Sequence, residues 1–559
     1  MKLVIVGGVA GGASAAARAR RLDEQAEIVM FERGEFVSFA NCGLPYYLGG
    51  EIEKRDELMV STPEKFKKRF NLEARTFSEV VEIDRKAGRV KVKDRRSGEF
   101  YFESYDKLIL SPGAEPIRPP LPGIELDSIF CLRDIPDADR ILAAIEAQKS
   151  GSAVIVGGGF IGLEMAENLH RRGLAVSVVE MMEQVMAPLD YDMAAIIHNH
   201  LREQGVNLVL RDAVESFERR RDGRTAVRTG RGRELAADLV ILAIGVKPET
   251  GLAARAGLEL GGRGGILVDD RMRTSDPDIF AVGDAVEVRN LVSGEMILLP
   301  LAGPANKQGR IAADNALGRE SRFAGAAGTS VVRIFELTAA GVGLNEKTLA
   351  GLGRPHLCSF THSPDHASYY PGAERLSIKL VFEPGSGKLL GAQAVGKKGV
   401  DKRIDVLAAS LSAGMTVFDL ERLELAYAPP FGSARDPVNV AGFVAANTLR
   451  GDHAIVHWHE LEGLDPERHQ LLDVRDPDEL QEAGPIPGAL PLPLDELRSR
   501  LSELDRSKTF IAYCAIGLRS YLAYRILVQR GFEARNLSGG YAAWAAVQQD
   551  RQATDPKEG

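Results

Sequence analysis

Two stretches of the chain share one pattern, in which a short apolar strand leads into glycines, a helix and a second apolar strand that ends in an acidic residue. The copies begin at Leu3 and Ala153, and their second strands end at Glu32 and Glu180. A short apolar run bounded by turn residues is typical of a buried parallel strand, and the glycines mark a tight turn into the helix. The repeat predicts two nested β-α-β units and an α/β fold.

Later parts of the chain carry other patterns. Strand-like segments separated by turn residues return between Leu376 and Val395, which predicts a sheet of different character. A polar turn after Asn447 marks a boundary, beyond which strands and helices alternate again. The last residues, from Asp550 to Gly559, are polar and are predicted to fray.

Composition limits the class of protein. A chain of 559 residues is long enough for three or four domains, and 45% hydrophobic with 26% charged residues is typical of a soluble globular protein. A net charge of −8 argues against a general nucleic-acid binder, and no apolar stretch is long enough for a membrane span. The four widely spaced cysteines form neither a disulfide framework nor a metal site, so we expect a protein of the reducing cytoplasm.

The second glycine loop has the full G-x-G-x-x-G spacing, with Gly157, Gly159 and Gly162 between a strand and a helix. Glycine at these positions lets backbone N–H groups and a helix N-terminus approach a pyrophosphate. Glu180 stands where a carboxylate bonds a ribose 2′-hydroxyl, and it would repel a 2′-phosphate. We therefore predict that this unit binds NADH in preference to NADPH.

The first glycine loop departs from this pattern, because Val9 stands at the middle position between Gly7 and Gly12. Two further features support a nucleotide site, namely Glu32 at the strand end and a later segment that ends in Val-Gly-Asp284. In the flavoprotein reductases that this segment resembles, the aspartate contacts the ribityl and pyrophosphate part of FAD. The resemblance implies that the first unit binds FAD, and the alternative is that both loops are ordinary tight turns.

One unpaired cysteine, Cys42, follows the first unit, and the next cysteine is Cys131. With this cysteine and the two glycine loops, residues 1 to about 446 resemble the pyridine nucleotide–disulfide oxidoreductase family. Dithiol members carry two cysteines separated by four residues beside the flavin, and the second is absent here. An internal disulfide is therefore excluded, so the redox partner must be an external thiol, a sulfenic acid or a persulfide.

The single-cysteine branch of this family contains coenzyme A disulfide reductases, NADH oxidases and NADH peroxidases. The oxidases and peroxidases place a histidine in the first glycine loop, and Ala10 stands at that position here. Oxygen and peroxide chemistry is less favoured without that acid/base group, whereas thiolate exchange needs only a low-pKa cysteine and a good leaving group. The chain therefore resembles the coenzyme A disulfide reductases more closely.

Several positions match substrate contacts of the coenzyme A reductases. Arg18 and Arg21 lie three residues apart on one face of the first helix, where they suit a phosphorylated adenosine tail. The alternative is that these arginines and Arg20 form an ordinary solvated face. The further matching positions are Ser14, Ser38, Asn41, Asn306 and Arg435.

A pair of tyrosines extends the resemblance to the dimer. In coenzyme A disulfide reductases two tyrosines from the partner subunit reach the active-site cysteine, where hydroxyls can donate protons or hold a thiolate. The matching residues are Tyr369 and Tyr427, with Tyr370 as an alternative for the first. The resemblance implies a homodimer that is required for catalysis, and plain interface packing is the alternative role.

The last hundred residues resemble a rhodanese domain with the active loop Cys514-Ala-Ile-Gly-Leu-Arg519. Such a loop closes from a strand end onto a helix, predicted to begin at Ser520, and aims its amides at the sulfur, which stabilises a persulfide. The related phosphatase loops have five intervening residues, so the four found here suit sulfur rather than phosphate. Cys131 and Cys358 have no comparable setting and are predicted to be buried small hydrophobes.

The resemblance implies an α/β protein with two nested Rossmann-like domains, an α+β dimerisation domain and a C-terminal α/β rhodanese domain. We predict NADH-dependent, flavin-linked reduction of coenzyme A persulfide, polysulfide or coenzyme A disulfide at Cys42, with Cys514 carrying sulfane sulfur. An NADH oxidase that uses oxygen and a non-catalytic redox sensor are the alternatives. The predicted boundaries are 1–112 and 245–325 for FAD, 113–244 for NAD, 326–446 for dimerisation, 447–454 for a linker, 455–548 for rhodanese and 549–559 for a tail.

Overall fold

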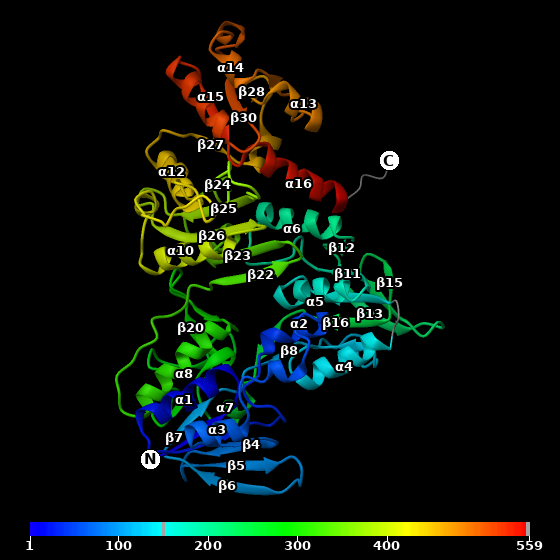
Figure 1. Ribbon diagram of the computed structural model, residues 1–559, viewed down its shortest axis with the longest axis vertical. Coiled ribbons are helices and arrows are strands. Elements are labelled where there is room, and N and C mark those ends of the chain that lie inside the picture. The colour runs from blue at the N-terminus through cyan, green and yellow to red at the C-terminus, as the bar shows by residue number, and fades with distance from the viewer. Residues whose placement is uncertain (148–150, 555–559) are drawn as a thin grey trace. The chain divides into compact units, whose positions relative to one another are not determined.

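The computed structural model describes residues 1–147 and 151–554, and the chain divides into two compact units. The first unit holds residues 1–181 and 211–326, and the second holds residues 182–210 together with the chain from residue 327 onward. Figure 1 shows the strands and helices of both units. Within the described ranges, no helix combines the length and apolar character needed to cross a bilayer.

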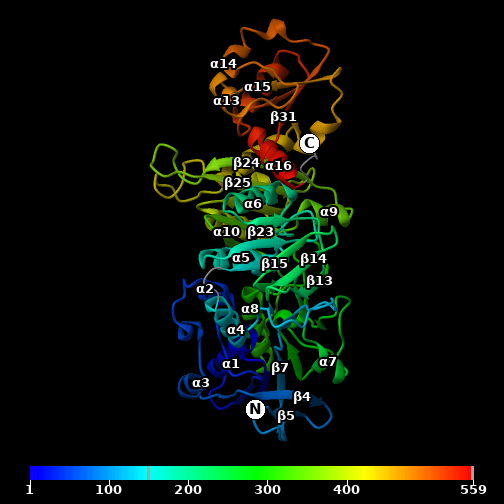
Figure 2. The ribbon, with the colours of Figure 1, turned by 90° about the vertical axis from the view of Figure 1, so that its right-hand side faces the viewer.

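The first unit contains a five-stranded parallel sheet that matches the first predicted β-α-β unit. Its central strand is buried along Leu3, Val4 and Ile5, as expected for a parallel sheet covered on both faces. Beside the sheet, α1 (Ala10–Leu22) packs against α8 (Ala302–Ala316) (Figures 1 and 2). In spatial order the strands are β19 (Ile279–Ala281), β7 (Lys107–Leu110), β1 (Lys2–Val6), β2 (Glu27–Phe31) and β3 (Glu73–Arg75).

A second parallel sheet of the first unit matches the second predicted copy. Here the helix is α5 (Phe160–Arg171), and it packs against α2 (Leu44–Gly49). The strands of this sheet that belong to the first unit are β11 (Ala175–Val179), β10 (Ser152–Val156), β16 (Leu239–Leu242) and β9 (Ile129–Phe130). Two antiparallel sheets accompany it, one of β4 (Ser78–Asp84), β5 (Arg89–Asp94) and β6 (Phe100–Ser104), the other of β13 (Val214–Arg219), β14 (Thr225–Thr229) and β15 (Glu234–Ala237).

Shorter elements complete the first unit. The helices are α3 (Pro63–Phe70), α4 (Ile135–Glu146) and α7 (Gly251–Arg255). The strands are β8 (Ala114–Pro116), β17 (Val246–Pro248), β18 (Ile266–Leu267), β20 (Val286–Arg289) and β21 (Met296–Leu298). The 3-10 turns are η1 (Asn41–Gly43), η2 (Arg55–Leu58) and η3 (Gly283–Ala285), of which η1 and η3 carry candidate site residues.

The second unit contains an antiparallel sheet, which confirms the predicted change of sheet type. Its strands, in spatial order, are β22 (Ser330–Ile334), β23 (Leu337–Gly343), β26 (Leu389–Gly396), β25 (Arg375–Phe382) and β24 (Leu357–Pro364). The helices that pack on it are α6 (Tyr191–Glu203), α10 (Val400–Ser412) and α12 (Pro437–Leu449). The predicted boundary after Asn447 falls in the last turn of α12. The remaining elements here are β12 (Asn207–Val209), α9 (Glu346–Gly351) and α11 (Val417–Leu420).

A parallel five-stranded sheet follows in the same unit. Its strands, in spatial order, are β27 (Ile455–Val456), β31 (Ala534–Leu537), β30 (Thr509–Tyr513), β28 (His469–Asp473) and β29 (Leu490–Pro491). The helical elements are η4 (Trp458–Gly463), α13 (Pro477–Ala483), α14 (Leu494–Leu497), η5 (Leu501–Glu503), α15 (Leu518–Gln529) and α16 (Gly540–Thr554). The helix after the cysteine loop thus begins two residues before the predicted Ser520.

The expectation that the chain frays from Asp550 is wrong, because α16 continues through Thr554 and packs against α6. Asp550 is fully buried, and its carboxylate accepts hydrogen bonds at 2.7 Å from Tyr191 Oη and Arg202 Nη1 and lies 2.9 Å from His198 Nδ1. Burial raises the pKa of Asp550, but these partners outweigh it and bring the pKa to about 2. Residues 555–559 of the predicted tail lie outside the described ranges.

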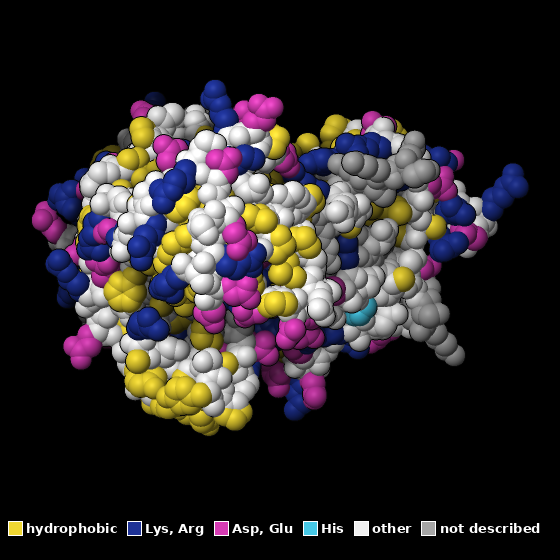
Figure 3. All heavy atoms as spheres, turned by 90° about the horizontal axis from the view of Figure 1, so that it is seen from above, with side chains coloured by type: hydrophobic (Ala, Val, Ile, Leu, Met, Phe, Trp, Pro, Cys, Tyr) yellow, Lys and Arg dark blue, Asp and Glu magenta, His cyan; other side chains and the backbone are white. Residues whose placement is uncertain are grey.

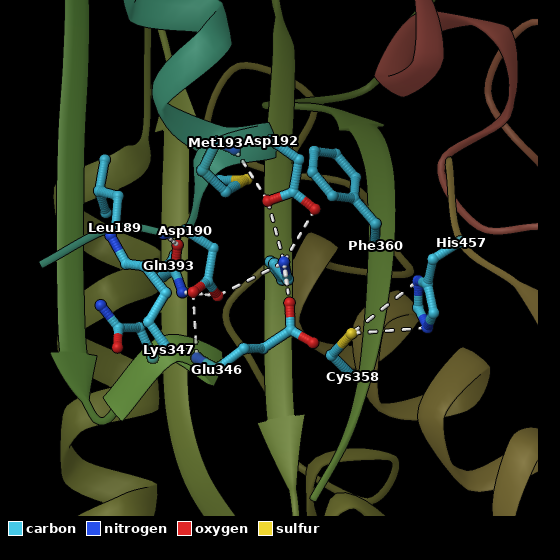
Figure 4. A network of polar contacts seen from close by, with 12 residues as sticks. Leu189, Asp190, Asp192, Met193, Glu346, Lys347, Cys358, Phe360, Gln393 and His457 are labelled. Atoms are coloured by element: carbon cyan, nitrogen blue, oxygen red, sulfur yellow. Dashed lines mark hydrogen bonds and ion pairs between the residues drawn. The ribbon is translucent and has the colours of Figure 1, made fainter. Parts of the chain in front are cut away.

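A buried polar network crosses the second unit (Figure 4). Lys379 on β25 is almost fully buried and forms ion pairs with Asp192, at 2.8 Å, and with Glu346. Burial lowers the pKa of Lys379, but the surrounding carboxylates raise it well above its usual value, so the amine is charged. Of the two cysteines predicted to be buried, Cys358 is buried and Cys131 is only partly so. The Cys358 Sγ lies 3.6 Å from His457 Nε2 rather than among apolar groups alone.

Candidate functional site

The first glycine loop is a narrow turn between β1 and α1. Gly7 has φ +96°, a region that favours glycine, and a Cβ on Gly12 would stand 1.9 Å from the Gly7 carbonyl oxygen. Just past β2, the Glu32 carboxylate accepts hydrogen bonds from the Gly8 and Gly34 amides at 3.0 and 2.9 Å. The tight turn and the carboxylate at the strand end fit the nucleotide part of FAD.

The second glycine loop gives a direct test of fit to a dinucleotide. Gly157 has φ +107°, and a Cβ on Gly162 would meet the Gly157 carbonyl oxygen at 2.1 Å. A Cβ on Gly159 would meet nothing within 4 Å, so internal packing does not require glycine there, whereas close approach of a pyrophosphate would. Glu180 Oε2 accepts a hydrogen bond from the Gly158 amide at 2.7 Å, which places the carboxylate beside the loop.

The predicted flavin-contacting aspartate, Asp284, lies on η3. The preceding Gly283 has φ +80°, and its amide donates a hydrogen bond to Gln308 Oε1 at 2.8 Å. Burial raises the pKa of Asp284, and the positive charge of Arg133 opposes that rise in part. Asp284 is thus half-buried and directly follows Gly283, whose backbone conformation favours glycine.

Cys42 lies on η1, immediately before α2, and the residue is exposed and free. Asn41 Oδ1 accepts a hydrogen bond from the Cys42 amide at 3.1 Å and lies 3.9 Å from Sγ. Desolvation of the sulfur, followed by the negative charges of Glu164 and Asp284, raises the pKa of the Cys42 thiol. The chain by itself therefore holds Cys42 as a thiol.

Sequence reasoning missed Glu164. This residue lies on α5, two residues after Gly162, and it accepts a hydrogen bond from Tyr46 Oη at 3.1 Å. Tyr46 belongs to the stretch that follows Cys42, so the second β-α-β unit supplies a charge to the cysteine of the first. No sequence spacing signals this, because the two residues are far apart in the chain.

The predicted coenzyme A positions of the first unit are partly engaged with one another. Ser14 donates a hydrogen bond to Asn306 Oδ1, and Arg18 Nε bonds Asp314 Oδ1 at 2.7 Å. Arg21 is exposed. Ser38 is buried with φ +56°, a strained conformation for a residue with a side chain, close to Cys42 in the chain.

The alternative of a solvated arginine face fails at Arg20. This residue is 5% exposed, and its guanidinium donates hydrogen bonds to the carbonyl oxygens of Asp23, Glu24, Ala26, Phe70 and Asn71. Arg20 therefore ties the end of α1 to the segment after α3. Of the three arginines, Arg21 is the one left exposed.

The predicted tyrosines lie in the second unit and meet there. Tyr369 Oη and Tyr427 Oη are 2.7 Å apart, and this hydrogen bond raises the pKa of Tyr369. Both rings are exposed, as are those of Tyr370 and Phe431, so the two loops present an aromatic surface. Exposed apolar clusters are visible on the face shown in Figure 3. Arg435, the last predicted coenzyme A position, is exposed a few residues further along the chain.

Cys514 follows directly after β30, which ends at Tyr513, and is 1% exposed. Its Sγ accepts hydrogen bonds from the Gly517 amide at 3.1 Å and from Ser520 Oγ at 3.4 Å. Gly540 packs beneath the loop, where a Cβ would stand 2.6 Å from the Cys514 carbonyl oxygen. The loop and the start of α15 thus supply donors to the sulfur without help from any other molecule.

Arg519, on α15, is bound by two carboxylates that sequence reasoning missed. Its Nη1 lies 2.7 Å from Asp476 Oδ2 and its Nη2 lies 2.7 Å from Glu479 Oε1. Hydrogen bonding to Glu479 raises the pKa of Arg519, although burial opposes this. The sequence signal for these two residues is the capping box Asp476-Pro-Asp-Glu479, which predicts the start of a helix. That signal does not say where the helix lies relative to the Cys514 loop, because tertiary packing decides this.

Three family patterns cover the chain in order. The first, pyridine nucleotide-disulphide oxidoreductase, matches residues 1–309, which is more than half of the chain. The chain belongs to this family. The dimerisation domain of the pyridine nucleotide-disulphide oxidoreductases matches residues 329–437, and a rhodanese-like domain matches residues 459–547. The predicted fold class is confirmed, and the protein is an oxidoreductase with a C-terminal rhodanese domain.

Two solved structures are similar to this chain over nearly its whole length. The reduced CoADR-RHD protein of Bacillus anthracis is 48% identical with a TM-score of 0.95, covering 98% of each chain. An NAD-dependent persulfide reductase from A. fulgidus is 41% identical with a TM-score of 0.92, covering 97% of this chain and 100% of that one. Both similarities include the rhodanese region, since the coverage extends past the dimerisation domain.

Other relatives match about four fifths of this chain, a length that corresponds to the chain without its rhodanese-like domain. A coenzyme A disulfide reductase of Staphylococcus haemolyticus is 35% identical over 445 residues, which are 79% of this chain and 99% of that protein. An NADH oxidase of Methanocaldococcus jannaschii is also 35% identical, over 451 residues that are 80% of this chain and 99% of that protein. Sequence identity alone thus does not separate a sulfur acceptor from an oxygen acceptor. Membership of the family implies FAD and NAD(P)H as cofactors.

Proposed function

We propose that this protein uses NADH and bound FAD to reduce the sulfur–sulfur bond of coenzyme A persulfide, polysulfide or coenzyme A disulfide at Cys42. The rhodanese domain accepts or delivers the sulfane sulfur as a persulfide on Cys514. The similarity to a persulfide reductase and to a coenzyme A disulfide reductase supports both parts of this proposal.

The observation that carries the proposal is the single exposed thiol of Cys42 in a flavoprotein fold. All four cysteines are free, and no second cysteine precedes Cys131. A dithiol reductase needs a partner cysteine within the same loop, so electrons that reach Cys42 must leave through a sulfur of another molecule. Ala10 begins α1 with a methyl group, which offers no acid or base for peroxide chemistry.

The reaction follows from what the residues of the chain can do. Bound FAD and NADH would supply two electrons to the cysteine site. Cys42, once deprotonated, attacks the sulfur bonded to the coenzyme A arm, the sulfur–sulfur bond breaks, and sulfide or a thiol leaves with the bonding pair. A mixed disulfide between Cys42 and the carrier remains, and the two electrons return it to two thiols. The Ser14, Arg18, Arg21, Ser38, Asn41 and Asn306 positions would hold the carrier.

The preference for NADH is part of the proposal. Glu180 stands beside the second glycine loop, where it suits a ribose hydroxyl and repels a 2′-phosphate. The similar A. fulgidus protein is NAD-dependent.

A homodimer completes the proposed site. The matched dimerisation domain supports association of two copies, and the exposed Tyr369 and Tyr427 pair would then serve the Cys42 of the partner. Their mutual hydrogen bond offers one free hydroxyl proton to a thiolate leaving group. Arg435 would add a positive charge for the phosphates of coenzyme A from the same subunit as the tyrosines.

Steady-state NADH consumption with coenzyme A persulfide tests the proposal. Cys42→Ser should reduce the rate to background, because the proposed mixed disulfide forms on the Cys42 sulfur. Cys131→Ser is the matched control, since that cysteine is also free, lies in the first unit and is partly exposed. A wild-type rate in Cys42→Ser contradicts the proposal.

NADH oxidase is the second candidate function, and the M. jannaschii relative favours it. Oxygen uptake that exceeds turnover with coenzyme A persulfide, polysulfide and coenzyme A disulfide in the same preparation would establish this activity instead. Ala10 predicts the opposite ranking.

A further inference from the structure

The charges around the Cys514 loop bear on which sulfur donors it can use. From Cys514 to Ser520 the loop carries one charged side chain, Arg519. Both terminal nitrogens of that guanidinium are occupied, one by Asp476 and one by Glu479, each at 2.7 Å. One positive charge is therefore accompanied by two negative charges.

The carboxylates face solvent more than the cation does. The exposed fractions are 62% for the Asp476 side chain, 32% for Glu479 and 29% for Arg519. The neighbouring Arg475 cannot take the place of Arg519, because its side chain is 2% exposed, pairs with Asp473 and lies 4.1 Å from the centre of the Tyr541 ring. An anion that approaches Arg519 therefore meets three side chains, the arginine and its two carboxylates, which together carry one negative charge.

The other side of the loop is apolar. Leu518 and Leu522 lie one turn apart on α15, and both are exposed, at 62% and 47%. Exposed leucines beside a reactive sulfur suit a methylene-rich, uncharged chain. The donor that fits both sides of the loop therefore carries its sulfane sulfur on an uncharged arm.

We infer that Cys514 takes sulfur from low-molecular-weight persulfides with an uncharged thiol arm and discriminates against thiosulfate. This inference rests on the proposed role of Cys514 as a sulfur carrier. The Cys514 thiolate attacks the outer sulfur of R–S–SH, the sulfur–sulfur bond breaks, and R–S⁻ leaves with the electron pair, so Cys514 holds a persulfide. Thiosulfate already carries two negative charges, and attack on its outer sulfur would break the sulfur–sulfur bond and release sulfite, also a dianion, near Asp476 and Glu479.

Sulfur transfer to cyanide tests the inference in the full-length protein carrying Cys42→Ser, so that Cys42 reacts with no donor. The donors are pantetheine persulfide and thiosulfate, and the rate of the Cys42→Ser/Cys514→Ser protein is subtracted as background. Pantetheine persulfide should be the better donor. Asp476→Asn with Glu479→Gln should raise kcat/KM for thiosulfate about tenfold and change that for pantetheine persulfide less than about twofold. Asn and Gln preserve the capping box of α13.

A control variant neutralises two carboxylates that form ion pairs with another arginine of the same domain. Glu496 and Glu503 pair with Arg500 in the same domain, and Glu496→Gln with Glu503→Gln should change neither donor. Preference of the parent protein for thiosulfate, or an unchanged donor ratio in the Asp476/Glu479 variant, would overturn the inference. Transfer that persists in full without Cys514 would instead contradict the proposed role of Cys514, so the two failures can be told apart.

Discussion

Cys514 and Cys42 both lie where a turn leads into a helix, but the groups around the two sulfur atoms differ. Cys514 is buried and receives hydrogen bonds from Gly517 and Ser520. Cys42 is exposed as a residue, and desolvation of its sulfur, followed by the negative charges of Glu164 and Asp284, raises the pKa of its thiol. The chain thus supplies hydrogen-bond donors to the Cys514 sulfur by itself, whereas the proposed reaction at Cys42 would need the bound cofactors.

This difference predicts that the two activities can be separated. Changes to the backbone of the rhodanese loop should remove sulfur transfer and spare NADH oxidation. Changes to the nucleotide loops should do the reverse. A change of charge near Cys42 should have a smaller effect on the pKa of its thiol, because desolvation and not charge is the largest cause of the raised pKa.

The largest expected effect is at Gly540. In Gly540→Ala the new Cβ would stand 2.6 Å from the Cys514 carbonyl oxygen and 2.9 Å from the Gly517 nitrogen, so the loop must move. Sulfur transfer from pantetheine persulfide to cyanide should fall about 100-fold, as small displacements of reacting groups do. NADH-dependent reduction of coenzyme A disulfide should change less than about twofold. Gly488→Ala is the matched control, because Gly488 also has positive φ but a Cβ there meets nothing within 4 Å.

The next effect concerns the dinucleotide. Glu180→Ala removes the carboxylate beside the second glycine loop, so kcat/KM for NADPH relative to NADH should rise about tenfold in the coenzyme A disulfide assay. Sulfur transfer at Cys514 uses no dinucleotide and should be unchanged in the same protein. An unaltered cofactor ratio would show that Glu180 does not select the ribose.

The smallest effect is on the pKa of Cys42. Since Glu164 raises this pKa, Glu164→Gln should lower it and shift the alkylation midpoint of the flavin-free protein to lower pH. More thiolate is then present at neutral pH, so alkylation by iodoacetamide should accelerate about threefold. Peptide mass spectrometry across a pH series measures the midpoint. Glu99→Gln, an exposed change in the same unit, should leave it in place, and an equal midpoint in all three proteins would exclude the charge effect.

Local pattern was enough to predict the parts of the fold that depend on short segments. The strands before Gly7 and Gly157 follow from apolar runs between turn residues, and both glycine loops have the geometry that their spacing requires. The cysteine loops were likewise found from residues within a few positions of Cys42 and Cys514. These features are encoded locally, so one sequence is sufficient.

The features that the sequence did not reveal depend on distant partners. The sequence around Asp550 is typical of a polar tail, yet the Asp550 carboxylate is buried and accepts hydrogen bonds from Tyr191 and Arg202. The sequence predicts Arg20 at the surface as an alternative, yet the side chain is buried and donates hydrogen bonds to backbone carbonyl oxygens of two segments. The charge of Glu164 reaches Cys42 from another β-α-β unit. Such contacts follow from packing, which residue type and spacing do not specify.

The central claim is that Cys42 exchanges with an external thiol carrier. Intact-protein mass spectrometry after reaction of the NADH-reduced protein with coenzyme A disulfide tests this directly, because a trapped mixed disulfide adds one coenzyme A to the chain. We predict one adduct per chain, mapped to Cys42, reversed by further NADH and absent in Cys42→Ser. An adduct on Cys131 or Cys514 alone, or oxidation of the reduced protein without any adduct at Cys42, would contradict the claim.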